Sequence, residues 1–75
     1  MIHSKFVHRA KDILGGTPVF IKTRVPVQVF IDYLEKGKSL DEFLKDFPSV
    51  SRKQTMGVLE ELKKMLLEKK YETAA

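Results

Sequence analysis

The stretch GGTPVFIKTRVPV, residues 15–27, contains two glycines, two prolines and an apolar run inside a chain that otherwise reads as helix. Gly15 and Gly16 take the positive φ angles of a hairpin turn at no steric cost, and short apolar segments flank them. Pro18 cannot donate to a strand ladder, so the second strand is an edge strand or begins after it. The stretch therefore predicts a β-hairpin whose turn lies at Gly15-Gly16.

Two further short segments bear on this hairpin. Residues 2–8 mix Ile2, Phe6 and Val7 with polar residues, which indicates a ragged edge strand. A small hairpin is marginal in isolation and must pack on helices or pair with another chain. The free edge of the predicted hairpin is therefore a candidate dimerisation edge.

Three helices are predicted after the hairpin. The first begins near Pro26, a residue suited to a first helical position, and ends at Gly37. The second is capped by Ser39 and ends before Pro48. The third is capped by Ser51 and runs from Arg52 to about Tyr71. Apolar residues recur at helical spacing in all three, at 27, 30, 31 and 34, at 40, 43, 44 and 47, and at 58, 59, 62, 65 and 66.

The length of the chain indicates a single domain over residues 1–75. The predicted elements make this domain α+β and mainly helical, with a strand and hairpin segment at 1–24 and a three-helix, homeodomain-like helix-turn-helix bundle at 25–71. The sequence has no cysteine, which is typical of a reducing cytoplasm and excludes disulfides and thiolate chemistry. It also has no apolar run long enough to span a membrane. A domain this small often needs a partner subunit, so we expect a soluble cytoplasmic protein that forms a homodimer or part of a complex.

The formal net charge is +4, with basic residues in excess at both ends and acidic residues in excess in the middle. A basic surface favours a polyanionic partner. In a helix-turn-helix arrangement the start of the third helix faces the major groove. That start contains Ser51, Arg52, Lys53 and Gln54, of which Arg52 and Lys53 suit phosphate or guanine, Gln54 suits adenine, and Ser51 at the helix N-terminus suits a phosphate. The alternative is an ordinary helix cap with two solvated cations.

The sequence contains few of the residue patterns that are typical of catalytic or metal sites. His3 and His8 lie near the N-terminus without further His or Cys to complete a ligand set, so neither a metal site nor a cofactor is predicted. The carboxylates of the second predicted helix occupy its polar side, and no nucleophile–base spacing or phosphate-binding glycine loop occurs. We therefore expect a protein that is not an enzyme.

The chain resembles the VapB-like antitoxin family, domain of unknown function 433. The resemblance is carried by the motifs Gly-x-Pro-Val and Thr-Arg-x-Pro-Val, a helix ending in Gly, a Ser-x-x-Glu helix and a turn before Pro. The resemblance covers residues 13–62 and rests on Gly16, Pro18, Val19, Thr23, Arg24, Pro26, Val27, Gly37, Ser39, Glu42 and Pro48. It implies a hairpin and a trihelical fold, a PIN-like nuclease toxin as partner and operator DNA as a further target. The family usually has Gly before the Thr-Arg pair, where this chain has Lys22.

Two functions remain open from the sequence. One is an antitoxin-like protein that binds operator DNA and neutralises a nuclease toxin. The other is a non-catalytic interaction or oligomerisation module without DNA binding. In either case the segment with Met65, Leu66, Leu67 and Tyr71 is too apolar for a free tail, and we expect it to bind a partner.

Two positions of the opening stretch carry specific expectations. Thr23 is expected to accept a hydrogen bond from an early helical amide or to bond within its own turn. Arg24 is a poor partner for a helix N-terminus, so we expect a carboxylate beside it, with Asp46 and Asp41 as candidates.

Overall fold

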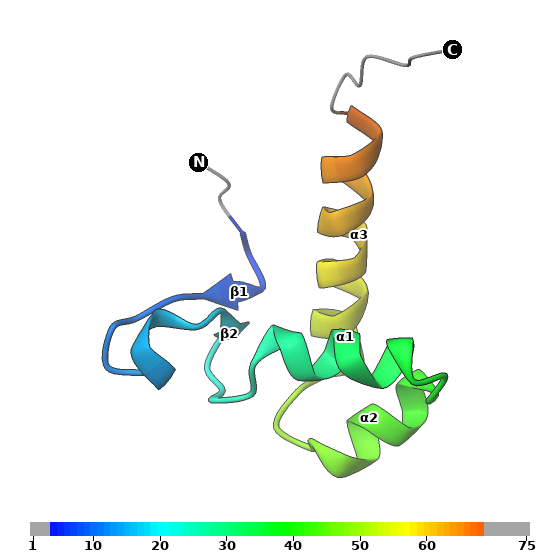
Figure 1. Cartoon of the computed structure of the whole chain (residues 1–75), viewed down its shortest axis with the longest axis horizontal. Coiled ribbons are helices and arrows are strands. Elements are labelled where there is room, and N and C mark those ends of the chain that lie inside the picture. The colour runs from blue at the N-terminus through cyan, green and yellow to red at the C-terminus, as the bar shows by residue number, and fades with distance from the viewer. Residues whose placement is uncertain (1–3, 69–75) are drawn as a thin grey trace.

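The computed structural model describes residues 4–68. In chain order these residues form β1 (Val7–His8), the 3-10 turn η1 (Leu14–Gly16), β2 (Val19–Phe20), and the helices α1 (Val27–Glu35), α2 (Leu40–Asp46) and α3 (Arg52–Glu68). The strands are antiparallel and lie at one side of the three helices (Figure 1). The predicted fold class, a hairpin followed by three helices, is confirmed.

The predicted hairpin turn at Gly15-Gly16 is wrong. Val7 pairs with Phe20 and His8 with Val19, so β1 lies inside the segment 2–8, and residues 9–18 join the two strands. Gly15 and Gly16 lie in η1, in the middle of this connection. The φ angles of residues 14, 15 and 16 are all positive, at 49°, 66° and 91°. Because three successive left-handed residues curl the backbone, this segment cannot extend a strand.

β2 forms backbone hydrogen bonds on both of its edges, although the sheet has only two strands. It pairs with β1 on one side, and on the other side Val19 forms a bridge with Pro26. The Phe20 amide donates to the Val25 carbonyl at 3.0 Å, and the Val27 amide donates to the Pro18 carbonyl at the same distance. The alternative in which this strand begins after Pro18 is confirmed. Both edges of β2 are therefore bonded within the chain, and dimerisation through the edge of the hairpin stays a prediction.

Three phenylalanine rings form the centre of the core. Phe20 of β2, Phe30 of α1 and Phe43 of α2 are each fully buried, with ring centroids between 5.0 and 6.0 Å apart. Val50, in the connection between α2 and α3, and Val58, in the first half of α3, pack against them. The opening stretch therefore places the largest side chain of β2 against all three helices.

The predicted helix ends are confirmed at α1 and α2. Pro26 is the N-cap of α1, and Gly37 follows its C-terminus with a φ of 78°. The Lys38 amide donates to the Tyr33 carbonyl at 2.9 Å, which together with the Gly37 amide bond closes a Schellman motif. The Ser39 hydroxyl accepts the amide hydrogen of Glu42 at the start of α2.

The N-terminal segment docks on α3. The Ser4 hydroxyl donates to the Glu61 carboxylate at 2.6 Å, and the Phe6 ring lies over Gly57 so closely that a Cβ there would be 2.4 Å from ring carbons. The upper turns of α3 rise clear of α1 and α2 (Figure 1). Over residues 4–68, none of the helices combines the length and the apolar character that crossing a bilayer requires.

Candidate nucleic-acid interface

The first turn of α3 is closed by two reciprocal hydrogen bonds. The backbone amide of Gln54 donates to the Ser51 hydroxyl at 3.1 Å, and the backbone amide of Ser51 donates to the side-chain Oε1 of Gln54 at 2.9 Å. This is a complete capping box, with Gln in the position that accepts from the cap residue. Ser51 and Gln54 are therefore held by each other, as an ordinary helix cap requires.

Gln54 also joins α3 to the segment after β2. Its Nε2 donates to the carbonyl oxygen of Ile21 at 2.9 Å. The side-chain amide thus uses its oxygen for the cap and its nitrogen for the Ile21 carbonyl. A bidentate contact from Gln54 to adenine uses both groups, and these two bonds already fix the orientation of the side-chain amide toward Ser51 and Ile21.

Ser51, Arg52 and Lys53 are exposed, and Arg52 and Lys53 are the two cations among them. The Arg52 guanidinium forms an ion pair with the Asp41 carboxylate of α2, and the two side chains are 59% and 78% exposed. An ion pair exposed to this degree contributes about 0–1 kcal/mol. A phosphate group therefore competes with Asp41 for Arg52 at little cost in stability.

The segment over residues 20–23, which we call the elbow turn, leads from β2 toward the start of α1. Thr23 donates twice to the Phe20 carbonyl, from its amide at 3.0 Å and from its hydroxyl at 2.8 Å. The same hydroxyl accepts from the Val25 amide at 3.1 Å, which confirms the alternative in which Thr23 bonds within its own turn. Lys22, the third residue of the turn, has a φ of 62°, a left-handed conformation that favours glycine in a turn of this kind.

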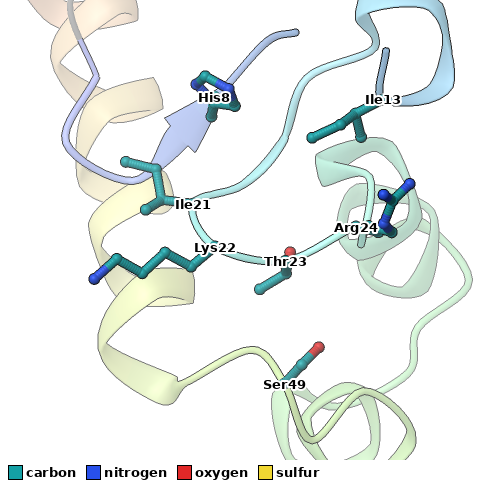
Figure 2. Close-up of a pocket in the computed structure, with 7 residues that line it drawn as sticks. All are labelled: His8, Ile13, Ile21, Lys22, Thr23, Arg24 and Ser49. Atoms are coloured by element: carbon teal, nitrogen blue, oxygen red, sulfur yellow. The ribbon is translucent and has the colours of Figure 1, made fainter.

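A hollow of about 720 Å³ lies beside the elbow turn, and we call it the elbow hollow. Its cationic and titratable side chains are His8, Lys22 and Arg24, its hydroxyls are those of Thr23 and Ser49, and its apolar lining is Ile13 and Ile21. Figure 2 shows these side chains around the hollow, with Lys22 and Arg24 extending to opposite sides. None of the lining residues among residues 4–68 is a carboxylate.

The predicted carboxylate partner of Arg24 is wrong. Asp41 pairs with Arg52, and Asp46 accepts the hydroxyl hydrogen of Tyr33 at 2.8 Å. Arg24 lies on the exposed surface beside the elbow hollow instead. The Thr23 hydroxyl already satisfies the backbone of this corner, so no carboxylate is needed to hold it.

The sequence reasoning missed the elbow hollow as a unit. Arg24 and Lys22 were noted one at a time, while His8 and Ser49 come from segments far away in the sequence. The available signal was Lys22 itself, because a lysine stands where the turn favours glycine.

The predicted partner-binding residues lie on the last described turns of α3. Met65, Leu66 and Leu67 are 45%, 61% and 73% exposed. Tyr71 lies outside the described residues. The apolar segment is therefore open on the surface of this chain, as a partner-binding segment requires.

Within the described part of the chain, no group of three or more His, Asp or Glu side chains is placed to hold a metal ion. His3 lies outside that part. The hydrogen bond to Asp46 raises the pKa of Tyr33, with smaller contributions from desolvation and from the charges of Asp46 and Glu42.

The comparisons with known proteins identify a family and no function. The model of a protein family of unknown function, DUF433, matches residues 7–60, most of the chain. No curated protein matches the chain. No solved structure matches it either.

Proposed function

The chain belongs to the DUF433 family, and on that premise we propose that it is an antitoxin-like protein that binds operator DNA through the first turn of α3. The observation that supports the proposal is the exposure of Arg52 and Lys53, next to each other at the N-terminal end of a helix of 17 residues. Cations in this position contact phosphates and position the helix on the duplex.

The proposed contacts are mainly electrostatic. Ser51 and Gln54 are bonded to each other and Gln54 to Ile21, so we assign them the role of shaping the end of the helix. Arg52 exchanges Asp41 for a phosphate, and Lys53 contacts a neighbouring phosphate. Binding of this kind weakens steeply with salt, because each neutralised phosphate releases counterions.

Neutralisation of a PIN-like nuclease toxin is the second part of this proposal. Its support is the exposed apolar segment of Met65, Leu66 and Leu67, at the opposite end of α3 from the proposed DNA contacts. The two ends of one helix thus serve two partners, and the role of the chain toward both is non-catalytic.

The test is fluorescence anisotropy of the promoter duplex upstream of the gene. We expect saturable binding by the natural chain at low salt and loss of most of that binding in the Arg52→Ala plus Lys53→Ala variant. The matched control is Lys63→Ala plus Lys64→Ala, which removes two exposed charges from the same helix about three turns away. Equal losses in both variants, or no binding at low salt, contradict the proposal.

The second candidate function is a non-catalytic interaction or oligomerisation module without DNA binding. The exposed Met65, Leu66 and Leu67 favour it, because they suit a second copy as well as a toxin. Deletion of residues 65–75, followed by light scattering and pull-down, tests whether this segment binds a partner. Loss of mass or of toxin binding supports a partner-binding segment, and unchanged mass and toxin binding contradict it.

A further inference from the structure

The elbow hollow has the chemistry of an anion site. Three segments distant in sequence supply its polar groups: His8 from β1, Lys22 and Thr23 from the elbow turn with Arg24 directly after it, and Ser49 from the connection between α2 and α3. The side chains of His8, Lys22, Arg24 and Ser49 donate hydrogen bonds or carry positive charge, whereas the Thr23 hydroxyl hydrogen is donated to the Phe20 carbonyl. None of the described residues that line the hollow is a carboxylate. A concave surface lined by one sign of charge concentrates ligands of the opposite sign.

Lys22 has a left-handed backbone conformation, which residues with a side chain disfavour. Its φ of 62° places an L side chain in the left-handed region, where glycine is the unstrained residue. Residues strained in this way persist only where the surrounding structure holds them, and they cluster at functional sites; Leu14 is the other non-glycine residue with a positive φ among the described residues. Here the side chain of Lys22 is exposed at the hollow, and no hydrogen bond or ion pair within residues 4–68 uses it.

The hollow is also held next to the proposed DNA contacts. The bond from Gln54 to the Ile21 carbonyl fixes the elbow turn to the first turn of α3, and Lys22 is the next residue after Ile21. Arg52 and Lys53 lie in that same first turn. Lys22 is therefore linked, through its neighbour Ile21, to the helix turn that carries Arg52 and Lys53.

We propose that the elbow hollow binds phosphate groups of the nucleic-acid backbone and extends the DNA contact from α3 to Lys22 and Arg24. This inference rests on the proposed DNA-binding function. Lys22 and Arg24 extend to opposite sides of the hollow (Figure 2), which suits successive phosphates along a strand better than one isolated ion. The volume of about 720 Å³ and the apolar lining of Ile13 and Ile21 leave room for the sugar between two phosphates.

Variants of Lys22 test the inference with two readouts. Lys22→Gly removes the charge and the strain, so we expect Tm to rise by roughly 4–8 °C while DNA affinity falls roughly three- to tenfold. Lys22→Ala removes only the charge and is expected to lose affinity without the gain in Tm. Lys22→Arg retains the charge and is expected to bind as the natural chain does. Lys36→Ala, at the far end of α1, is the matched charge control.

The DNA measurements use the same promoter duplex at several salt concentrations. We expect Lys22→Gly and Arg24→Ala each to reduce the slope of log affinity against log salt by roughly 0.9, the value for one phosphate contact. Lys36→Ala is expected to leave the slope unchanged. If the Lys22 variants bind as tightly as the natural chain, or lose no more than Lys36→Ala, the inference is overturned.

Two further arms separate the possible failures. This inference alone is overturned if Arg52→Ala plus Lys53→Ala loses DNA binding while the Lys22 and Arg24 variants bind as the natural chain does. If the natural chain does not bind DNA, the proposed function and this inference are both overturned. Titration with inorganic phosphate, followed by amide resonances of residues 21–24, tests the other source of the ligand. Saturable phosphate binding without an effect of Lys22→Gly on DNA overturns the assignment to the nucleic-acid backbone.

Discussion

The Nε2 of Gln54 donates to the carbonyl oxygen of Ile21 at 2.9 Å, and this bond joins the cap of α3 to the turn after β2. The Oε1 atom of the same side chain accepts from the Ser51 amide. One glutamine therefore sets the start of the third helix and its position against the elbow turn. The two basic surfaces described above depend on it for their relative placement.

Substitutions of Gln54 separate its two bonds. Gln54→Ala removes both and is expected to lower the free energy of unfolding by about 1–2 kcal/mol, because a cap acceptor and a part-buried bond are lost. Gln54→Glu keeps an acceptor for the Ser51 amide but no donor for the Ile21 carbonyl. We expect this variant to shift the amide resonances of residues 21–23 and to retain the helix signal of α3. Unchanged resonances there, measured by NMR, contradict the role of the Ile21 bond.

A substitution at Gly57 tests how the N-terminal segment docks. In most helix interiors Gly→Ala stabilises by about 0.5–1 kcal/mol. Here the new Cβ would lie 2.4 Å from ring carbons of Phe6, so Gly57→Ala is expected to destabilise by about 1–3 kcal/mol. In the Phe6→Ala background the same substitution is expected to stabilise. Denaturation of the four proteins of this double-mutant cycle checks the change of sign, and equal effects in both backgrounds contradict the contact.

Asp41 competes with DNA for Arg52 in this account. Asp41→Asn removes the negative charge from an exposed ion pair, so stability is expected to change by less than about 1 kcal/mol. DNA affinity is expected to increase, because Arg52 no longer exchanges one anion for another. The control is Asp32→Asn on α1, which removes one carboxylate away from α3. An affinity gain no greater in Asp41→Asn than in Asp32→Asn counts against Arg52 as a phosphate contact.

The Tyr33 hydroxyl links α1 to α2 through Asp46, and its pKa is raised by that bond. A group whose pKa is raised on folding stabilises the fold fully below its unfolded value, which is 10.0 for this tyrosine. That contribution is lost as pH rises from 10.0 through the raised pKa of the folded state. We therefore expect Tyr33→Phe to abolish part of the alkaline loss of stability, measured by denaturation across this pH window. An identical alkaline profile in both proteins rules out the effect.

The helices and their ends were predictable from local signals. The apolar spacing of α1 and α2 and the capping residues Ser39 and Ser51 depend on neighbours three or four positions away, and the structure places them as expected. Membership of the DUF433 family, read from the elbow residues, is confirmed by the match over residues 7–60, while the antitoxin assignment stays a prediction.

The errors concern contacts between distant segments. Gly15 and Gly16 carry the sequence signature of a tight hairpin turn, but Leu14 before them also has a positive φ and moves the turn into a longer connection. The partner of Arg24 was sought among carboxylates of the right charge, but Arg52 and Tyr33 occupy both of them. Local propensity contains no information on which of several cations reaches a given carboxylate.

The central claim, that α3 binds DNA phosphates through Arg52 and Lys53, is tested most directly by the salt dependence of binding. Affinity for the upstream promoter duplex is measured over a range of salt concentrations for the natural chain and for Arg52→Ala plus Lys53→Ala. We predict that the slope of log affinity against log salt is smaller in the variant by roughly 1.8, which corresponds to two lost phosphate contacts. Equal slopes in the two proteins would contradict the claim.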